Sequence, residues 1–139
     1  MLIGEHSHLI DTKGRLNFPS RMREVFGDRF IVTRGFDRCL NVYSLQEWFK
    51  LESSIKDLPR NKRRDIERFF FSGAIEVVPD KQGRIVISPT LREYAQLERN
   101  IVVVGASDHA EIWNEAAWKK EFDRLSPESI TKIMDDLDF

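Results

Sequence analysis

Alternating polar and apolar positions follow two short turns of the chain. Leu16 and Phe18 alternate with polar residues after the first turn, and Ile85 and Ile87 do so after the second. Because successive side chains of a strand point to opposite faces, each run predicts a strand with one apolar face. Residues 5–10 predict the strand that leads into the first turn.

The two turns share one pattern, in which Asp is followed by two polar residues, Gly, Arg and an aliphatic residue. The pattern occupies residues 11–16 and 80–85. The Asp can accept a hydrogen bond from the backbone N–H two residues on, and the Gly supplies the positive φ that ends a short loop. We therefore expect each pattern to form the tip of a β-hairpin. The turn-shaping residues are Asp11, Gly14, Asp80 and Gly83.

The similarity between the two halves extends beyond the turns. Residues 22–24 match residues 91–93, and later apolar runs match at slightly larger offsets, as short insertions would produce. We interpret the chain as two copies of one unit. The predicted boundaries are 5–50 for the first unit, 51–75 for a basic and Phe-rich helical linker, 76–120 for the second unit and 121–139 for an acidic helix or tail.

Within each unit the pattern predicts the order strand, strand, helix, strand, strand, followed by a further helix. Ser88 followed by Pro89 marks a helix start, Ser44 with Glu47 forms a capping box, and Asn114 caps the equivalent helix of the second unit. The fold class is therefore α+β. The predicted strands are 5–10, 15–18, 30–33, 39–43, 101–104 and 111–113, and the predicted short helices are 20–26 and 90–96.

Each unit is too small to form a robust core alone, since a lone core is marginal below ~40 to 60 residues. We expect the two copies to bury their apolar faces against each other or against another subunit. In the linker, Ile66, Phe69, Phe70 and Gly73 recur at helical spacing. This stripe indicates either core or a subunit interface.

The net charge of −1 conceals an asymmetry between the halves. Residues 1–73 carry 14 Lys and Arg against 10 Asp and Glu, whereas residues 74–139 carry 8 against 13. The first half therefore suits a polyanion and the second a protein or solvent. The most basic segment, residues 60–64, is either a solvated helix start or a contact for an acidic neighbour.

Few residues suggest catalysis or metal binding. Cys39 is either a reactive thiol or a small buried apolar residue, and its being the single cysteine excludes an internal disulfide. His6 and His8 share a strand face, but no third metal ligand follows at a recognisable spacing. His109 beside Asp108 could form half of a catalytic pair, but no nucleophile is evident for it. We expect no enzyme, metal, cofactor or small-molecule substrate. No run approaches the ~18 apolar residues of a membrane span, so a cytoplasmic protein is expected.

Together these features resemble the MraZ family of bacterial transcriptional regulators. The resemblance rests on the paired Asp-x-x-Gly-Arg turns, the opening residues 4–11 and the linker residues 68–74, and it covers essentially the whole chain. It implies two AbrB-like swapped-hairpin units forming a pseudo-dimer within one chain, with flanking helices. It also implies a homo-oligomeric ring, a nucleoid-associated location, and binding of double-stranded DNA at short direct repeats. Those repeats would lie in the promoter of the cell division and cell wall operon that contains its own gene.

The resemblance further implies that Asp11 and Arg15, with their counterparts in the second turn, belong to an Asp-x-x-x-Arg motif associated with DNA contact. Arg suits this task because its planar fork can bind a guanine edge or a phosphate bidentately. One copy alone would equally fit an ordinary surface ion pair. Gln82 stands where the first turn has Lys13, which removes the positive charge at that position of the second turn. The candidate DNA-binding residues are Lys13, Arg15, Arg21, Arg23, Lys81 and Arg84.

The rival interpretation is an oligomeric protein-interaction module, such as the antitoxin role of some AbrB-like proteins, without sequence-specific operator binding. A co-purifying toxin-like partner would favour the module. Retention on promoter DNA with a steep salt dependence would favour the regulator.

Overall fold

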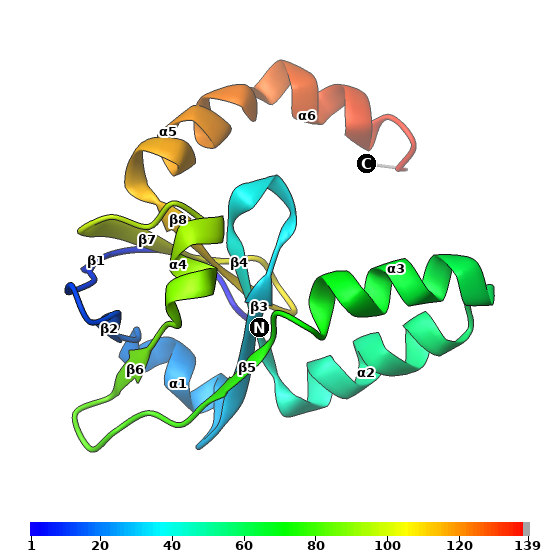
Figure 1. Cartoon of the computed structure of the whole chain (residues 1–139). Coiled ribbons are helices and arrows are strands. Elements are labelled where there is room, and N and C mark those ends of the chain that lie inside the picture. Colours follow the sequence, from blue (N-terminus) through cyan, green and yellow to red (C-terminus); the bar gives the residue numbers. More distant parts are fainter. Residues whose placement is uncertain (138–139) are drawn as a thin grey trace.

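The computed structural model describes residues 1–137, which form a six-stranded antiparallel sheet, a two-stranded antiparallel ribbon and surrounding helices (Figure 1). The strands are β1 (Glu5–Leu9), β2 (Arg15–Asn17), β3 (Phe30–Arg34), β4 (Leu40–Ser44), β5 (Ile75–Val77), β6 (Arg84–Val86), β7 (Asn100–Gly105) and β8 (Ala110–Asn114). The helices are α1 (Ser20–Phe26), α2 (Leu45–Lys56), α3 (Arg60–Phe70), α4 (Pro89–Tyr94), α5 (Glu115–Arg124) and α6 (Pro127–Met134), with a 3₁₀ turn at Phe36–Arg38. This arrangement agrees with the predicted α+β class.

The two halves of the chain exchange their first strands. In the sheet order β1-β7-β8-β4-β3-β5, β1 pairs with β7 of the second half and β5 pairs with β3 of the first. The ribbon likewise joins β2 to β6. The predicted hairpin tip is present at the first turn, where the N–H of Asp11 donates to the Arg15 carbonyl at 3.0 Å, but within residues 1–137 the flanking strands pair only through one bridge, between Ile10 and Leu16. Pairing between the halves supplies the ladder hydrogen bonds instead.

One core joins both halves. The rings of Phe18, Phe26 and Phe30 pack with centroids 5.1 to 5.4 Å apart, and Ile85 and Ile87 from the second half belong to the same buried cluster. The expectation that the two copies bury their apolar faces against each other is confirmed.

The helix starts follow the predicted caps. Ser44, Ser88 and Asn114 each accept a hydrogen bond from a backbone N–H of the first helical turn, at 3.1 to 3.4 Å. The capping box is only half formed in residues 1–137, where the Glu47 carboxylate binds the Lys50 ammonium at 3.1 Å.

Helices α2 and α3 form a helical hairpin that projects from the sheet (Figure 1). The face of α3 that carries Ile66, Phe69 and Phe70 packs with Trp48 and Ile55 of α2 in a second apolar cluster. Of the two alternatives for this stripe, the structure supports core within the chain.

Helices α5 and α6 follow one another in an arc along one side of the molecule (Figure 1). They carry exposed apolar side chains, with Phe122 at 56% and Ile133 at 68% of full exposure. Within residues 1–137, no helix combines the length and apolarity needed to span a bilayer.

Candidate nucleic-acid interface

Each turn holds its arginine by the same set of hydrogen bonds. In the first turn, one carboxylate oxygen of Asp11 accepts the backbone N–H groups of Lys13 and Arg15 at 2.9 Å, and the other accepts Nε–H of Arg15 at 2.7 Å. Asp80 repeats these contacts in the second turn, including 2.9 Å to Nε of Arg84. The aspartate thus shapes the turn and fixes the direction of the guanidinium.

The hydrogen bonds keep both aspartates ionised. The backbone N–H of Arg15 lowers the pKa of Asp11 most, and its side chain adds to the effect. The backbone N–H of Arg84 lowers the pKa of Asp80 in the same way. Within residues 1–137, neither guanidinium has a protein acceptor for its terminal nitrogens. Both terminal nitrogens of each arginine, with four N–H donors between them, are therefore free to bind an external ligand.

Both arginines lie on one face of the ribbon. Asn17 of β2 is opposite Arg84 of β6, and Arg15 is opposite Val86, so these four side chains share the outer face, while the central pair of the ribbon is buried. A groove of about 280 Å³ is lined by Arg15, Asn17, Arg84 and Arg99. Two separate hairpins would not place the two turns on a common surface, whereas the exchanged strands do.

Sequence reasoning did not identify Asn17 and Arg99 in this groove. Arg99 comes next to the first turn because β1 pairs with β7, and its carbonyl accepts the N–H of Ile10 at 3.0 Å. Asn17 could have been found from the alternation in β2, since it is two residues after Arg15.

The other predicted cations fall into two groups. Three of them occupy exposed positions, namely Lys13, Arg21 and Lys81. Arg23 is half-buried and lies against Gly83 of the second turn, and its Nε has no acceptor within the described chain. Its counterpart Arg92 donates to the carbonyls of Ile87 and Thr12 at 3.1 Å. Arg92 thus holds the turn of the opposite half by a hydrogen bond, whereas Arg23 only lies against it.

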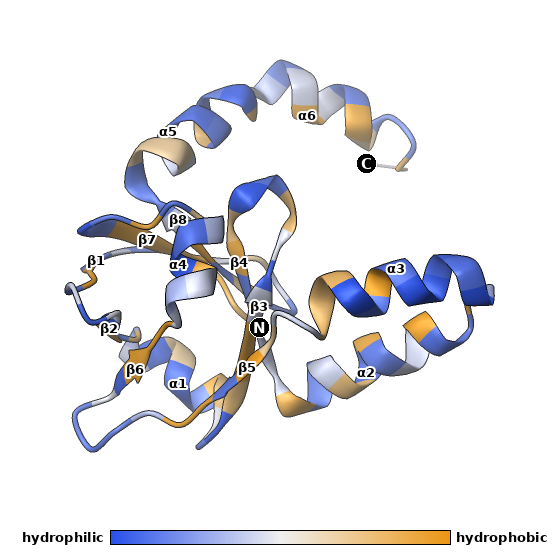
Figure 2. Cartoon of the chain, in the orientation of Figure 1, coloured by the Kyte–Doolittle hydropathy of each residue, from blue (hydrophilic) through white to orange (hydrophobic). Residues whose placement is uncertain are grey.

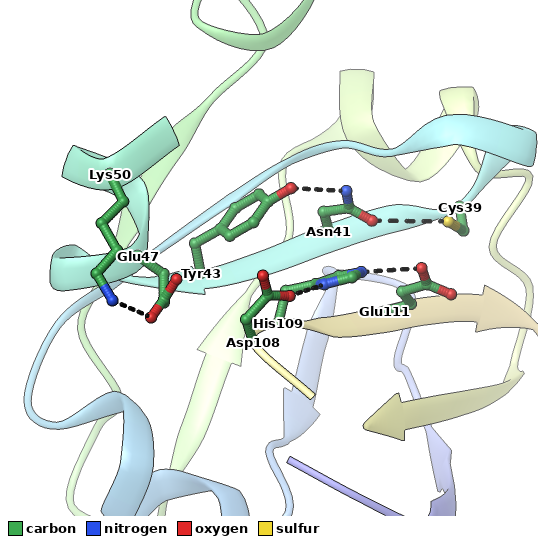
Figure 3. Close-up of polar contacts among 8 residues, drawn as sticks. All are labelled: Cys39, Asn41, Tyr43, Glu47, Lys50, Asp108, His109 and Glu111. Atoms are coloured by element: carbon green, nitrogen blue, oxygen red, sulfur yellow. Dashed lines mark hydrogen bonds and ion pairs between the residues drawn. The ribbon is translucent and has the colours of Figure 1, made fainter. Parts of the chain in front are cut away.

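A polar cluster around His109 is the other concentration of titratable groups (Figure 3). Its Nδ1 is 2.8 Å from Asp108, and its Nε2 is 3.0 Å from Glu111, which also accepts the indole N–H of Trp113 at 2.9 Å. The imidazole stacks on Tyr43 at 5.7 Å between centroids. Because both ring nitrogens face carboxylates, neither is free to act as a base. The prediction of a structural turn residue fits this geometry.

This cluster predicts a pH dependence of stability. The hydrogen bond with Glu111, aided by Asp108, raises the pKa of His109 against the opposing effect of burial. A folded pKa above the unfolded value of 6.5 means that the stabilisation is complete below about pH 6.5 and is lost as the pH rises through the folded pKa. The melting temperature of wild type minus that of His109→Gln should therefore fall as the pH rises from 6 to 8.5. A difference that stays constant over this range would show that the imidazolium pair adds nothing.

The remaining candidates for chemistry have structural environments. Cys39 is 1% exposed, and burial raises the pKa of its thiol, so it is the small buried residue and not the reactive thiol. Burial, followed by the charge of His6, lowers the pKa of His8. Among residues 1–137, no group of three or more His, Cys, Asp or Glu side chains is placed to hold a metal ion.

Comparison with known proteins identifies the family. The model of the family described as "MraZ protein, putative antitoxin-like" matches residues 1–68 and 70–138. A protein of Alkaliphilus metalliredigens is 49% identical over 141 residues, and one of Caldicellulosiruptor saccharolyticus is 47% identical over 141 residues; in both cases 99% of each chain is covered. A protein of Pelotomaculum thermopropionicum is 52% identical over 121 residues, which cover 86% of this chain and 83% of the relative. All three relatives are named transcriptional regulator MraZ, and with matches of this extent the chain belongs to the MraZ family.

Proposed function

We propose that this chain is a DNA-binding transcriptional regulator that recognises short direct repeats in the promoter of the cell division and cell wall operon containing its own gene. The observation that carries the proposal is the pair of arginines on the outer face of the β2–β6 ribbon, each oriented by its own aspartate. A two-stranded ribbon fits the major groove of B-DNA, and an arginine with two free terminal nitrogens can bind guanine or phosphate bidentately. The names of the relatives support a regulatory role.

The proposed fold is a swapped-hairpin pseudo-dimer of AbrB-like units, with units at 5–50 and 76–120. The exchange of first strands between the halves supports it, as does the ribbon built from one strand of each half. In this arrangement neither half can present its arginine correctly without the other. The DNA-binding face is therefore a property of the fused chain.

The proposed regulator acts as a homo-oligomeric ring. A chain with a net charge of −1 is a weak lone DNA binder, because affinity comes mainly from phosphate neutralisation. Linked sites that match the spacing of repeated half-sites gain ~10² to 10⁴ in avidity. The exposed apolar residues of α5 and α6 and the basic start of α3 at Arg60 offer surfaces for a second copy. The proposed regulator is non-catalytic, needs no cofactor and is located in the cytoplasm on the nucleoid.

The test is binding of the purified full chain to duplex DNA from the region upstream of its own gene. We expect retention of this duplex over a scrambled duplex of equal length. The logarithm of the binding constant should fall with log salt by about 0.9 for each phosphate contacted. Equal binding of both duplexes at moderate salt would contradict sequence-specific operator binding.

A second candidate function is an antitoxin-like protein-interaction module, which the printed description of the family keeps open. The same purified protein distinguishes the two candidate functions. A toxin-like protein that co-purifies in fixed ratio, together with no preference for the upstream duplex, would favour the module.

A further inference from the structure

The two halves of the ribbon face are not equivalent. Arg15 and Arg84 are 69 residues apart and occupy matching positions, and the same offset relates Asn17 to Val86. Asn17 is an exposed amide, whereas Val86 is an apolar side chain at 55% exposure. Figure 2 shows β6 as hydrophobic along most of its length. Besides its two arginines, the outer face of the ribbon therefore carries an amide on β2 and an apolar side chain on β6.

The asymmetry continues beside the ribbon. Phe30 of β3 and Ile101 of β7 hold equivalent positions, since each pairs with the matching residue of the exchanged strand. Asp28 and Arg99 lie two residues before them, so the charge is reversed between the halves. Arg99 lines the groove that contains Asn17, whereas Asp28 lines the hollow beside the second turn. The half that carries the amide is thus also the more positive one.

The amide of Asn17 is available for an external ligand. Within residues 1–137 it makes no hydrogen bond to the protein, although it lies between Arg15 and Arg84 in the groove. An asparagine side chain offers one acceptor and two donors, which match N6 and N7 of adenine. A valine at the equivalent position can make only apolar contact, for example with the methyl group of thymine.

We propose that Asn17 is a specificity-determining residue that hydrogen-bonds the edge of an adenine, and that its replacement by Val86 in the other half gives the ribbon a direction on DNA. This inference rests on the proposed DNA-binding function. A two-fold symmetric ribbon would favour an inverted site, whereas a ribbon with two different halves binds a directional site. A direct repeat presents such sites in a constant orientation.

The experiment is selection of binding sites from a randomised duplex library by three full-length chains: wild type, Asn17→Val and Val86→Asn. Wild type should select adenine at one position of each repeat. Asn17→Val should lose that preference by roughly 5- to 150-fold, as expected for one bidentate base contact, and its selected site should become symmetric. Val86→Asn should gain adenine at the symmetry-related position. The salt dependence should be unchanged in both variants, because neither residue carries charge.

The experiment distinguishes failure of the proposed function from failure of the inference about Asn17. If wild type selects no sequence, the proposed function falls and this inference falls with it. Wild type and Asn17→Val could select the same site, or Asn17→Val could bind every sequence more weakly by the same factor. Either result would mean that Asn17 does not read a base. Melting temperatures of the three chains establish folding. If Asn17→Val is unfolded, Val86→Asn alone decides: an unchanged selected site overturns the inference, and a new adenine supports it.

Discussion

Replacing Arg15 with alanine should abolish retention of the upstream duplex while leaving the oligomer intact. The guanidinium is held by Asp11 at 2.7 Å, and its terminal nitrogens have no other acceptor in the described chain. Its loss removes one charge-assisted bidentate contact per chain, each of which is worth about 1 to 3 kcal/mol. Because the proposed ring binds through several chains at once, the losses of affinity from two linked chains multiply. The affinity for the duplex should then fall at least tenfold, and more than a thousandfold at the upper end of this range.

The matched control is Arg84→Ala, which removes the same side chain from the second turn. It should weaken binding less, because the position two residues before the arginine is Lys13 in the first turn and uncharged Gln82 in the second, whose lysine lies one position earlier. Gel shift at moderate salt gives the affinities, and light scattering gives the mass of each variant. An Arg15→Ala chain that shifts the upstream duplex as well as wild type does would refute the role given to Arg15. A lower mass would instead place Arg15 in assembly.

Local chemistry is the part of this molecule that the sequence makes predictable. The turn bonds of Asp11 and the helix start at Ser88 depend on residues within four positions of each other, and both were predicted. The relation between Arg15 and Arg84 was not predictable in this way. A period of two shows that a segment is a strand with one apolar face, but it does not identify the partner strand.

The exchange of strands also explains why two arginines occupy positions that the sequence pattern does not indicate. Arg23 is a candidate DNA-binding residue from the sequence, but the structure sets it against the turn of the other half, at Gly83. Arg99 is not among the candidates from the sequence, and pairing of β1 with β7 brings it to the groove beside Arg15. Both positions follow from contacts between residues far apart in the chain. Such contacts depend on packing of the whole core, which a local pattern does not specify.

Replacing Gly14 with alanine should destabilise the fold by about 2 to 4 kcal/mol. Gly14 has φ of 83°, where an L-residue costs about 1 to 2 kcal/mol. A Cβ there would lie 2.4 Å from the backbone oxygen of Ile87, so that the backbone itself must move. This movement would also disturb the hydrogen bond from the N–H of Ile87 to the Gly14 carbonyl, now 2.8 Å, which is worth about 0.5 to 1.5 kcal/mol.

Gly83→Ala is the matched variant in the second turn and should cost only about 1 to 2 kcal/mol. Its φ of 77° is similar, but the added Cβ meets the terminal nitrogen of Arg23 at 2.0 Å, and this flexible end can swing aside. Urea unfolding at fixed protein concentration, followed by circular dichroism, measures both losses. Equal losses would mean that the contact with Ile87 adds no strain beyond that of the backbone angle. A larger loss for Gly14→Ala, with weaker DNA binding at temperatures where the variant is folded, would tie the close approach of the two halves to the orientation of Arg15.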